Sequence, residues 1–226
     1  MNLAQLSLLD QAVFVLAALI LFLSFTLLAQ SRLVAGIHVF AWQGAVLAGA
    51  TALVAVNGAH HLFISAGLTL LLKALLIPWM LHQQVRKLEL ERHVETLPHA
   101  ALVLMGGAAL VIFSYWVVVP IERLELLETR NIISLSLAVI LLGLLIMVTR
   151  RQAVTQVIGF MSMENGLFMA AVAATHGMPL VVELGVAFDV LVAAVLFGVF
   201  FLHISESIDS LDTDRLNRLA APEDEE

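Results

Sequence analysis

QAVFVLAALILFLSFTLLA, residues 11–29, is a run of nineteen residues without a charged side chain. The hydrocarbon core of a bilayer is about 30 Å thick and is crossed by about 20 apolar residues in a helix, so this run predicts a membrane-spanning helix. Further runs of similar length lie between polar breaks at residues 33–56, 62–81, 100–119, 132–149, 153–175 and 180–203. The sequence therefore predicts an all-α membrane protein, a bundle of about seven transmembrane helices.

The composition agrees with this class of protein. Of the 226 residues 61% are hydrophobic and only 13% are charged, whereas soluble domains have about 45–50% apolar and about 25% charged residues. A secreted soluble domain, a nucleic-acid binder and a disulfide scaffold are excluded. Because the chain has no cysteine, it cannot hold an iron–sulfur cluster by itself. Its histidines fall near the predicted cytoplasmic edge or in loops, and no pair falls within the predicted membrane core. We therefore expect no catalytic, cofactor or metal site on this chain, and we expect electron chemistry on another subunit.

The basic residues predict the orientation, because cytoplasmic loops carry an excess of Lys and Arg. One side of the predicted bundle has only Arg123 and Arg130. The other side collects Arg32, Arg86, Lys87, Arg92, Arg150, Arg151, Arg215 and Arg218. We therefore expect the N-terminus outside and the C-terminus in the cytoplasm.

Four charged residues fall inside the predicted spans, and these are the candidate functional residues: Lys73, Glu164, Glu183 and Asp189. A charge near the centre of a membrane helix costs roughly 2.5–3.5 kcal/mol on the insertion scale, so each is expected to face protein or water and to have a partner or a task. At 1.5 Å per residue, Glu164 and Asp189 lie about 18 and about 21 Å from the cytoplasmic edge. Lys73 lies at about 13 Å, and Glu183 is close to the outer end of its helix.

This arrangement predicts a lateral proton relay. Burial disfavours the charged form of an ionisable group, so such groups exchange protons near neutral pH. The depths place Lys73, Glu164 and Asp189 too far apart for direct contact but within reach of bridging water. The alternative is static: Lys73 and one carboxylate form an ion pair that holds helices or subunits together. Pro78 removes one helical hydrogen bond, which predicts a loosened helix beside Lys73.

Residues 150–152 (RRQ) and 158–165 (IGFMSMEN) resemble the second helix of the K subunit of respiratory complex I and are similar to the C subunit of Mrp-type antiporters. In that family a basic turn leads into a helix with a buried glutamate, and the next helix carries a second acid. Asp189 stands at the place of the second acid. The family's glutamate position is Met161 here, and Glu164 follows one helical turn later on the same face.

The whole chain resembles hydrogenase-4 component E, with residues 75–79 (LLIPW) and 91–95 (ERHVE) similar to that family's central region. The resemblance implies a membrane subunit of a complex I-like or group 4 [NiFe]-hydrogenase complex in the bacterial or archaeal cytoplasmic (inner) membrane. Its partners would be antiporter-like membrane subunits and a hydrogenase or oxidoreductase module. Iron–sulfur clusters and the [NiFe] centre would lie on those partners. A subunit of a Mrp-type cation/proton antiporter and a structural membrane anchor are the alternative functions.

The predicted organisation has four parts. Residues 1–99 form a three-helix membrane region with a cytoplasmic connector, and residues 100–130 a linking helix with an outer loop. Residues 131–204 form the three-helix region that resembles the K subunit, and residues 205–226 an acidic cytoplasmic tail. When the first three helices are laid over the last three as a parallel repeat, with a small gap, Gln43 falls near Glu164 and Lys73 falls near Asp189. Such a repeat would extend the polar path to Gln43.

Overall fold

The computed structural model describes residues 8–56, 62–87, 99–118, 127–175, 185, 187–195 and 198. Throughout this part of the chain the regular structure is helical, which confirms the all-α prediction. The elements are α1 (Leu8–Ala29), α2 (Leu33–Val56), α3 (Leu62–Thr69), the π-helix η2 (Leu70–Leu76), α4 (Ile77–Lys87), α5 (Ala100–Val118), α6 (Leu127–Thr149) and α7 (Ala153–Thr175). Residues 187–195 are also helical.

Five of the described helices are long and apolar enough to cross a membrane: Gln11–Ala29, Leu33–Val56, Leu62–Lys87, Ala100–Val118 and Asn131–Thr149. They correspond to the first five predicted spans. Helix α7 has a similar length and contains the polar residues Gln156, Glu164 and Asn165. The seventh predicted span lies partly outside the described residues. Glu183 and the acidic tail 205–226 lie entirely outside them. The count of seven and the orientation therefore stay predictions.

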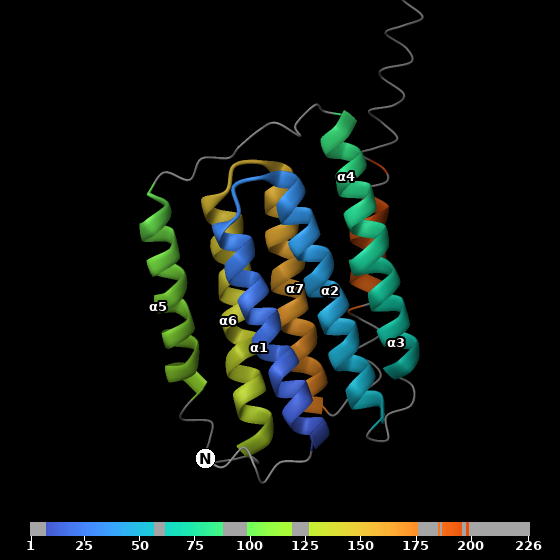
Figure 1. Ribbon diagram of the computed structural model, residues 1–226, viewed down its shortest axis with the longest axis vertical. Coiled ribbons are helices and arrows are strands. Elements are labelled where there is room, and N and C mark those ends of the chain that lie inside the picture. Colours follow the sequence, from blue (N-terminus) through green and yellow to red (C-terminus); the bar gives the residue numbers. More distant parts are fainter. Residues whose placement is uncertain are drawn as a thin grey trace, which may run out of the picture.

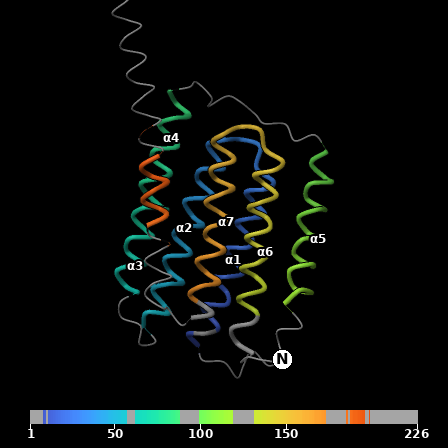
Figure 2. The backbone as a smooth tube through the Cα atoms, turned by 180° about the vertical axis from the view of Figure 1, so that it is seen from behind, coloured from blue at the N-terminus to red at the C-terminus, as the bar shows by residue number. Residues whose placement is uncertain are grey.

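Helices α1, α2, α6 and α7 form the centre of the bundle (Figure 1). Helix α5 packs against α6 and α1 at one side. The continuous rod α3–η2–α4 packs against α2 at the other side, and its η2 segment contacts α2 directly. Figure 2 shows the helical segment 187–195, coloured orange-red, next to this rod. Segments from both ends of the sequence thus meet beside η2.

The outside of the helix bundle is apolar, and several polar and charged side chains are buried inside it beside an apolar core. Large apolar residues on the outside of several helices are exposed, including Trp42 (68%), Ile112 (71%) and Val148 (83%). Buried among the helices are polar and charged residues: Ser24, Gln43, Lys73, Ser162, Glu164, Asn165 and Asp189. An apolar exterior, with the charged side chains turned into the bundle, is what a lipid environment requires, since intramembrane charges face the bundle interior. The structure therefore supports a membrane protein.

Close packing of α7 on α6 depends on small residues where the two helices meet. At Gly159 a Cβ atom would stand 2.8 Å from Ile146 Cγ2 and 3.1 Å from the carbonyl oxygen of Gly143 on α6. A larger residue at this position would push the two helices apart. The close approach fixes α7, the helix that carries Glu164.

The turns α1–α2 and α6–α7 and the C-terminal end of α4 lie at the same end of the bundle (Figure 1). These segments carry Arg32, Arg86, Lys87, Arg150 and Arg151, so the described part of the predicted basic side is gathered at one end. Arg150 is buried there, and its Nη2 donates to the carbonyl oxygens of Leu28 at 2.8 Å and Gln30 at 2.5 Å. A cation at the C-terminus of α1 satisfies carbonyls that lack helical partners.

We expect an Arg150→Leu variant to unfold at a lower temperature than the wild-type protein in detergent. The substitution removes hydrogen bonds from a charged donor, each worth about 1.5–3 kcal/mol. Arg151→Leu is the control, because Arg151 is exposed on the same turn and carries the same charge. Equal unfolding temperatures for the two variants would contradict the assignment of Arg150 as the cap of α1.

Candidate functional site: a buried lysine and two carboxylates

Lys73 lies in a π-helical stretch rather than in a regular α-helix. Residues Leu70–Leu76 form η2, and the N–H of Ile77, directly after it, bonds to the carbonyl oxygen of Leu72 in the i to i−5 pattern of a π-helix. Pro78 follows at once; its ring would clash with the carbonyl of Ala74 in a regular α-helix, and it has no N–H to donate. The predicted loosening of the helix beside Lys73 is confirmed in this form. Short π-helical insertions are frequent at functional sites.

Gly44 on α2 allows the backbone of η2 to come close at Lys73. A Cβ atom at Gly44 would stand 2.8 Å from Lys73 Cβ and 3.0 Å from the Lys73 carbonyl carbon. Since contacts under 3.0 Å essentially never occur for a real Cβ, the position requires glycine in this packing. The contact presses η2 against α2 and directs the lysine into the bundle.

The Lys73 ammonium lies between two carboxylates and a carboxamide. It donates to Glu164 Oε2 and, at 2.9 Å, to Asn165 Oδ1, and it lies 3.3 Å from Asp189 Oδ1. Lys73 and Asn165 are fully buried, and Glu164 and Asp189 are 6% and 1% exposed. Such a cluster of charges, shielded from water, interacts much more strongly than a surface ion pair.

An aromatic ring of α7 lies close to the ammonium. Lys73 Nζ is 5.5 Å from the centroid of the Phe168 ring, within the range of a cation–π contact. Phe160 of α7 also packs against Phe188, with ring centroids 5.6 Å apart. Phe188 directly precedes Asp189, so this aromatic pair helps to hold the second carboxylate beside the lysine.

A second group of polar side chains joins the cluster through Asn165. Asn165 Nδ2 donates to Gln43 Oε1 at 3.2 Å. Gln43 Nε2 in turn donates to Ser24 Oγ at 2.7 Å and to Ser162 Oγ at 3.1 Å. The hydrogen bonds therefore run from η2 through α7 and α2 to α1.

A cavity of about 400 Å³ borders the cluster between α7 and the segment around residue 188. It is lined by Phe160, Met163, Glu164, Leu167, Phe168, Ala171, Gly185 and Phe188. Glu164 is the charged residue of this lining, and its Oε1 has no hydrogen-bond partner among the described residues. Glu164 is thus the member of the cluster that borders open space.

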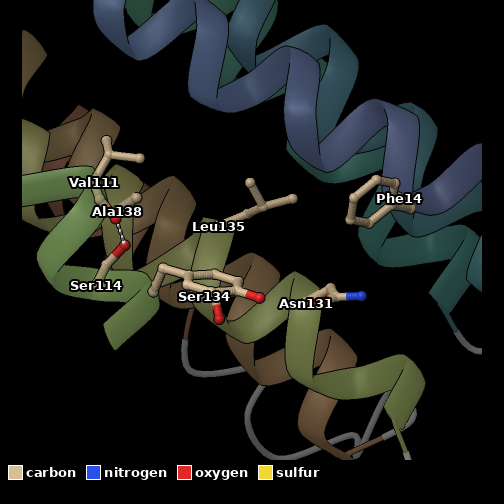
Figure 3. A pocket seen from close by; sticks show the side chains of 8 residues that line it. Phe14, Val111, Ser114, Asn131, Ser134, Leu135 and Ala138 are labelled. Atoms are coloured by element: carbon tan, nitrogen blue, oxygen red, sulfur yellow. Dashed lines mark hydrogen bonds between the residues drawn. The ribbon is translucent and has the colours of Figure 1, made fainter. Parts of the chain in front are cut away.

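A second cavity, of about 270 Å³, lies between α1, α5 and α6 (Figure 3). Its lining residues are Phe14, Val111, Ser114, Tyr115, Asn131, Ser134, Leu135 and Ala138. The Ser114 hydroxyl donates to the carbonyl oxygen of Val111 within α5. Because this lining has no charged side chain, the Lys73 cluster is the better candidate for a functional site.

One expectation from the sequence is wrong. Lys73, Glu164 and Asp189 do not need water to bridge them, because the lysine contacts both carboxylates directly. The depth estimate used backbone positions, whereas helical side chains tilt toward the N-terminus of their helix. Lys73 and Glu164 lie on helices of opposite direction, so their side chains tilt toward each other in depth. The ion pair of the static interpretation is present, and the proton path stays a prediction.

The structure brings together four of the five predicted site residues: Gln43, Lys73, Glu164 and Asp189. Glu183 lies outside the described residues. Asn165, Ser24 and Ser162 belong to the same network but were not among the predicted residues. Asn165 gave a usable signal, a second polar residue directly after the glutamate, whereas serines are common in ordinary membrane helices.

The fold and the cluster define a polytopic helical membrane protein with an ionisable group of residues in the centre of its bundle. The chain belongs to the same family as the uncharacterized protein Rv0085 of Mycobacterium tuberculosis. The two are 34% identical over 185 residues, which cover 81% of this chain and 84% of the relative.

More distant similarity links the chain to hydrogenase-4 component E of Escherichia coli K12, with 26% identity over 161 residues, 71% of this chain and 74% of the relative. The protein of the same name from Shigella flexneri gives the same values. The predicted resemblance is thereby confirmed as a distant one. No protein-family profile and no solved structure matches the chain. The resemblance of residues 150–203 to the K and C subunits stays a prediction.

Proposed function

We propose that this chain is a membrane subunit of a complex I-like or group 4 [NiFe]-hydrogenase complex in the cytoplasmic membrane of a bacterium or archaeon. In this proposal Lys73, Glu164 and Asp189 form part of a proton translocation path. The path is coupled to redox chemistry on partner subunits, which hold the iron–sulfur clusters and any [NiFe] centre. The similarity to hydrogenase-4 component E and the apolar helices support the assignment to such a complex.

The observation that carries the proposal is the charge balance of the cluster. One ammonium contacts two carboxyl groups, and all three are buried. If all were ionised, the cluster would keep an uncompensated negative charge in a low-dielectric environment, which costs several kcal/mol. One additional proton makes the cluster neutral. The cluster is thus suited to hold a proton on either Glu164 or Asp189 beside a charged Lys73.

The neutral cluster has two states, one with the proton on Glu164 and one with the proton on Asp189. Lys73 pairs with the carboxylate that is ionised, so a shift of the ammonium toward one group favours the transfer of the proton to the other. A change of charge or helix position in a partner subunit biases this balance. Glu164, which borders the cavity, is the group through which the proton enters or leaves the cluster. Gln43 is the uncharged neighbour at the opposite end.

The test is the number of protons translocated per electron by the assembled complex in membrane vesicles. Glu164→Gln and Asp189→Asn keep the size of each side chain but remove its proton exchange, so each is expected to lower this number severalfold. Assembly and electron transfer should remain. Normal pumping per electron in both variants would refute the proton path and leave the structural anchor as the function.

The Mrp-type antiporter is the second candidate function, because the same cluster can exchange a proton for a small cation. Its signature is transport that depends on sodium at constant electron flow. Sodium-independent proton translocation supports the hydrogenase or oxidoreductase complex instead.

A further inference from the structure

A chain of hydrogen bonds leads from Lys73 away from the two carboxylates, and in this chain each residue donates to the next one. Lys73 donates to Asn165 Oδ1, Asn165 Nδ2 donates to Gln43 Oε1, and Gln43 Nε2 donates to Ser24 Oγ. The Ser24 hydroxyl then donates to the carbonyl oxygen of Ile20 at 3.0 Å. The chain thus begins at an ammonium and ends at a backbone acceptor, and every step has a donor and an acceptor.

The bond from Lys73 to Asn165 fixes which residue is the donor in every later bond of the chain. An ammonium group has only donors, so Asn165 must turn its oxygen, not its NH₂ group, toward Lys73. The NH₂ group of Asn165 then faces Gln43, which must present its own oxygen. Gln43 and Asn165 are fully buried, so their polar atoms need hydrogen-bond partners inside the protein. The hydrogen bond between the two amides therefore holds the orientation of both.

The two sides of Lys73 differ in their ability to take up protons. Glu164 and Asp189 carry carboxyl groups, whereas the carboxamides of Asn165 and Gln43 have no ionisable proton in the physiological range. We propose that Asn165 and Gln43 are positioning residues that form a non-titratable acceptor of fixed orientation. This acceptor holds the Lys73 ammonium in place while the proton of the cluster moves between the two carboxyl groups. The inference rests on the proposed function and adds to it the residues that keep the lysine in position.

The sequence allows a direct measurement, because Lys73 and Lys87 are the only lysines in the chain. The full chain is prepared with isotope-labelled lysine in lipid vesicles, and magnetic resonance gives the rate at which each ammonium exchanges protons with water. Lys87 is exposed, and its exchange rate in the same sample serves as the internal reference. We expect Asn165→Leu to speed exchange at Lys73 about tenfold or more, the effect of one hydrogen bond from a charged donor.

Gln43→Met tests the transmission through Asn165, since Gln43 does not touch the lysine. Without the Gln43 oxygen, Asn165 is free to rotate, and exchange at Lys73 is expected to rise in the same direction. Gln43→Glu in its protonated form has an acceptor for Asn165 and a donor for Ser24, so it should restore slow exchange. Thr51→Val is the control, because Thr51 is buried on the same helix and, among the residues that the structure describes, its hydroxyl bonds to the carbonyl oxygen of Leu47 in the turn before it.

Unchanged exchange at Lys73 in Gln43→Met with wild-type unfolding temperature would overturn the inference, even if Asn165→Leu does not fold. Equal acceleration in Thr51→Val would also overturn it, because the effect would then be a general loosening of the bundle. The measurement requires neither electron transfer nor pumping. Its result is therefore independent of whether Glu164→Gln and Asp189→Asn change proton translocation.

Discussion

A Lys73→Met variant is expected to abolish proton translocation and to lower the amount of folded protein in the membrane. The substitution leaves Glu164 and Asp189 in the same buried site without their positive partner. Removal of one partner of a buried ion pair costs about 3–5 kcal/mol, because the remaining charge is uncompensated. The yield of folded protein, the unfolding temperature and the protons translocated per electron are the three measurements.

The triple variant Lys73→Met, Glu164→Gln, Asp189→Asn separates the two effects. It has no charge left in the cluster, and replacement of a whole buried ionic group by neutral residues is often neutral or stabilising. We expect it to recover the unfolding temperature but not the translocation. If the triple variant were as unstable as Lys73→Met alone, charge compensation would not be the reason for the instability. Normal translocation by Lys73→Met would remove the lysine from the path.

Much of the bundle could be predicted from the sequence because its determinants are local. The length of an apolar run between polar breaks is set by the bilayer, so the predicted spans 33–56 and 153–175 coincide with α2 and α7. The cost of a buried charge singled out Lys73, Glu164 and Asp189, and these three form one cluster.

The contacts within the cluster could not be predicted, because they depend on the relation between helices. Position along a helix gives the depth of a residue, but not its rotation about the helix axis or the separation of neighbouring axes. The approach of η2 to Gly44 and the hydrogen bond between Asn165 and Gln43 follow from those quantities. Pro78 predicted a weakened helix, but the π-helical turn that results also depends on how η2 packs against α2.

A Gly44→Ala variant is expected to destabilise the protein and to disturb the lysine cluster. The added Cβ would stand 2.8 Å from Lys73 Cβ and 3.1 Å from the carbonyl oxygen of Lys73, and these backbone-linked atoms cannot move aside as a flexible side chain can. Overpacking of this kind costs about 1–3 kcal/mol. Because η2 must move away from α2, the contacts of Lys73 with Asn165 and Glu164 lengthen. The unfolding temperature and the exchange of the Lys73 ammonium with water measure the two effects.

Gly49→Ala is a matched control on the same helix, since a Cβ at Gly49 would meet nothing within 4 Å. There the change from glycine to alanine favours the helix by roughly 0.5–1 kcal/mol, so this variant should be at least as stable as the wild type. If Gly44→Ala behaved like Gly49→Ala, the close approach of η2 to α2 would not be needed for stability. If Gly44→Ala lowered stability but left the exchange of Lys73 unchanged, the cluster would be held by α7 alone. The expected pair of results, a less stable protein with faster exchange at Lys73, makes Gly44 the position that couples the packing of the bundle to the geometry of its charges.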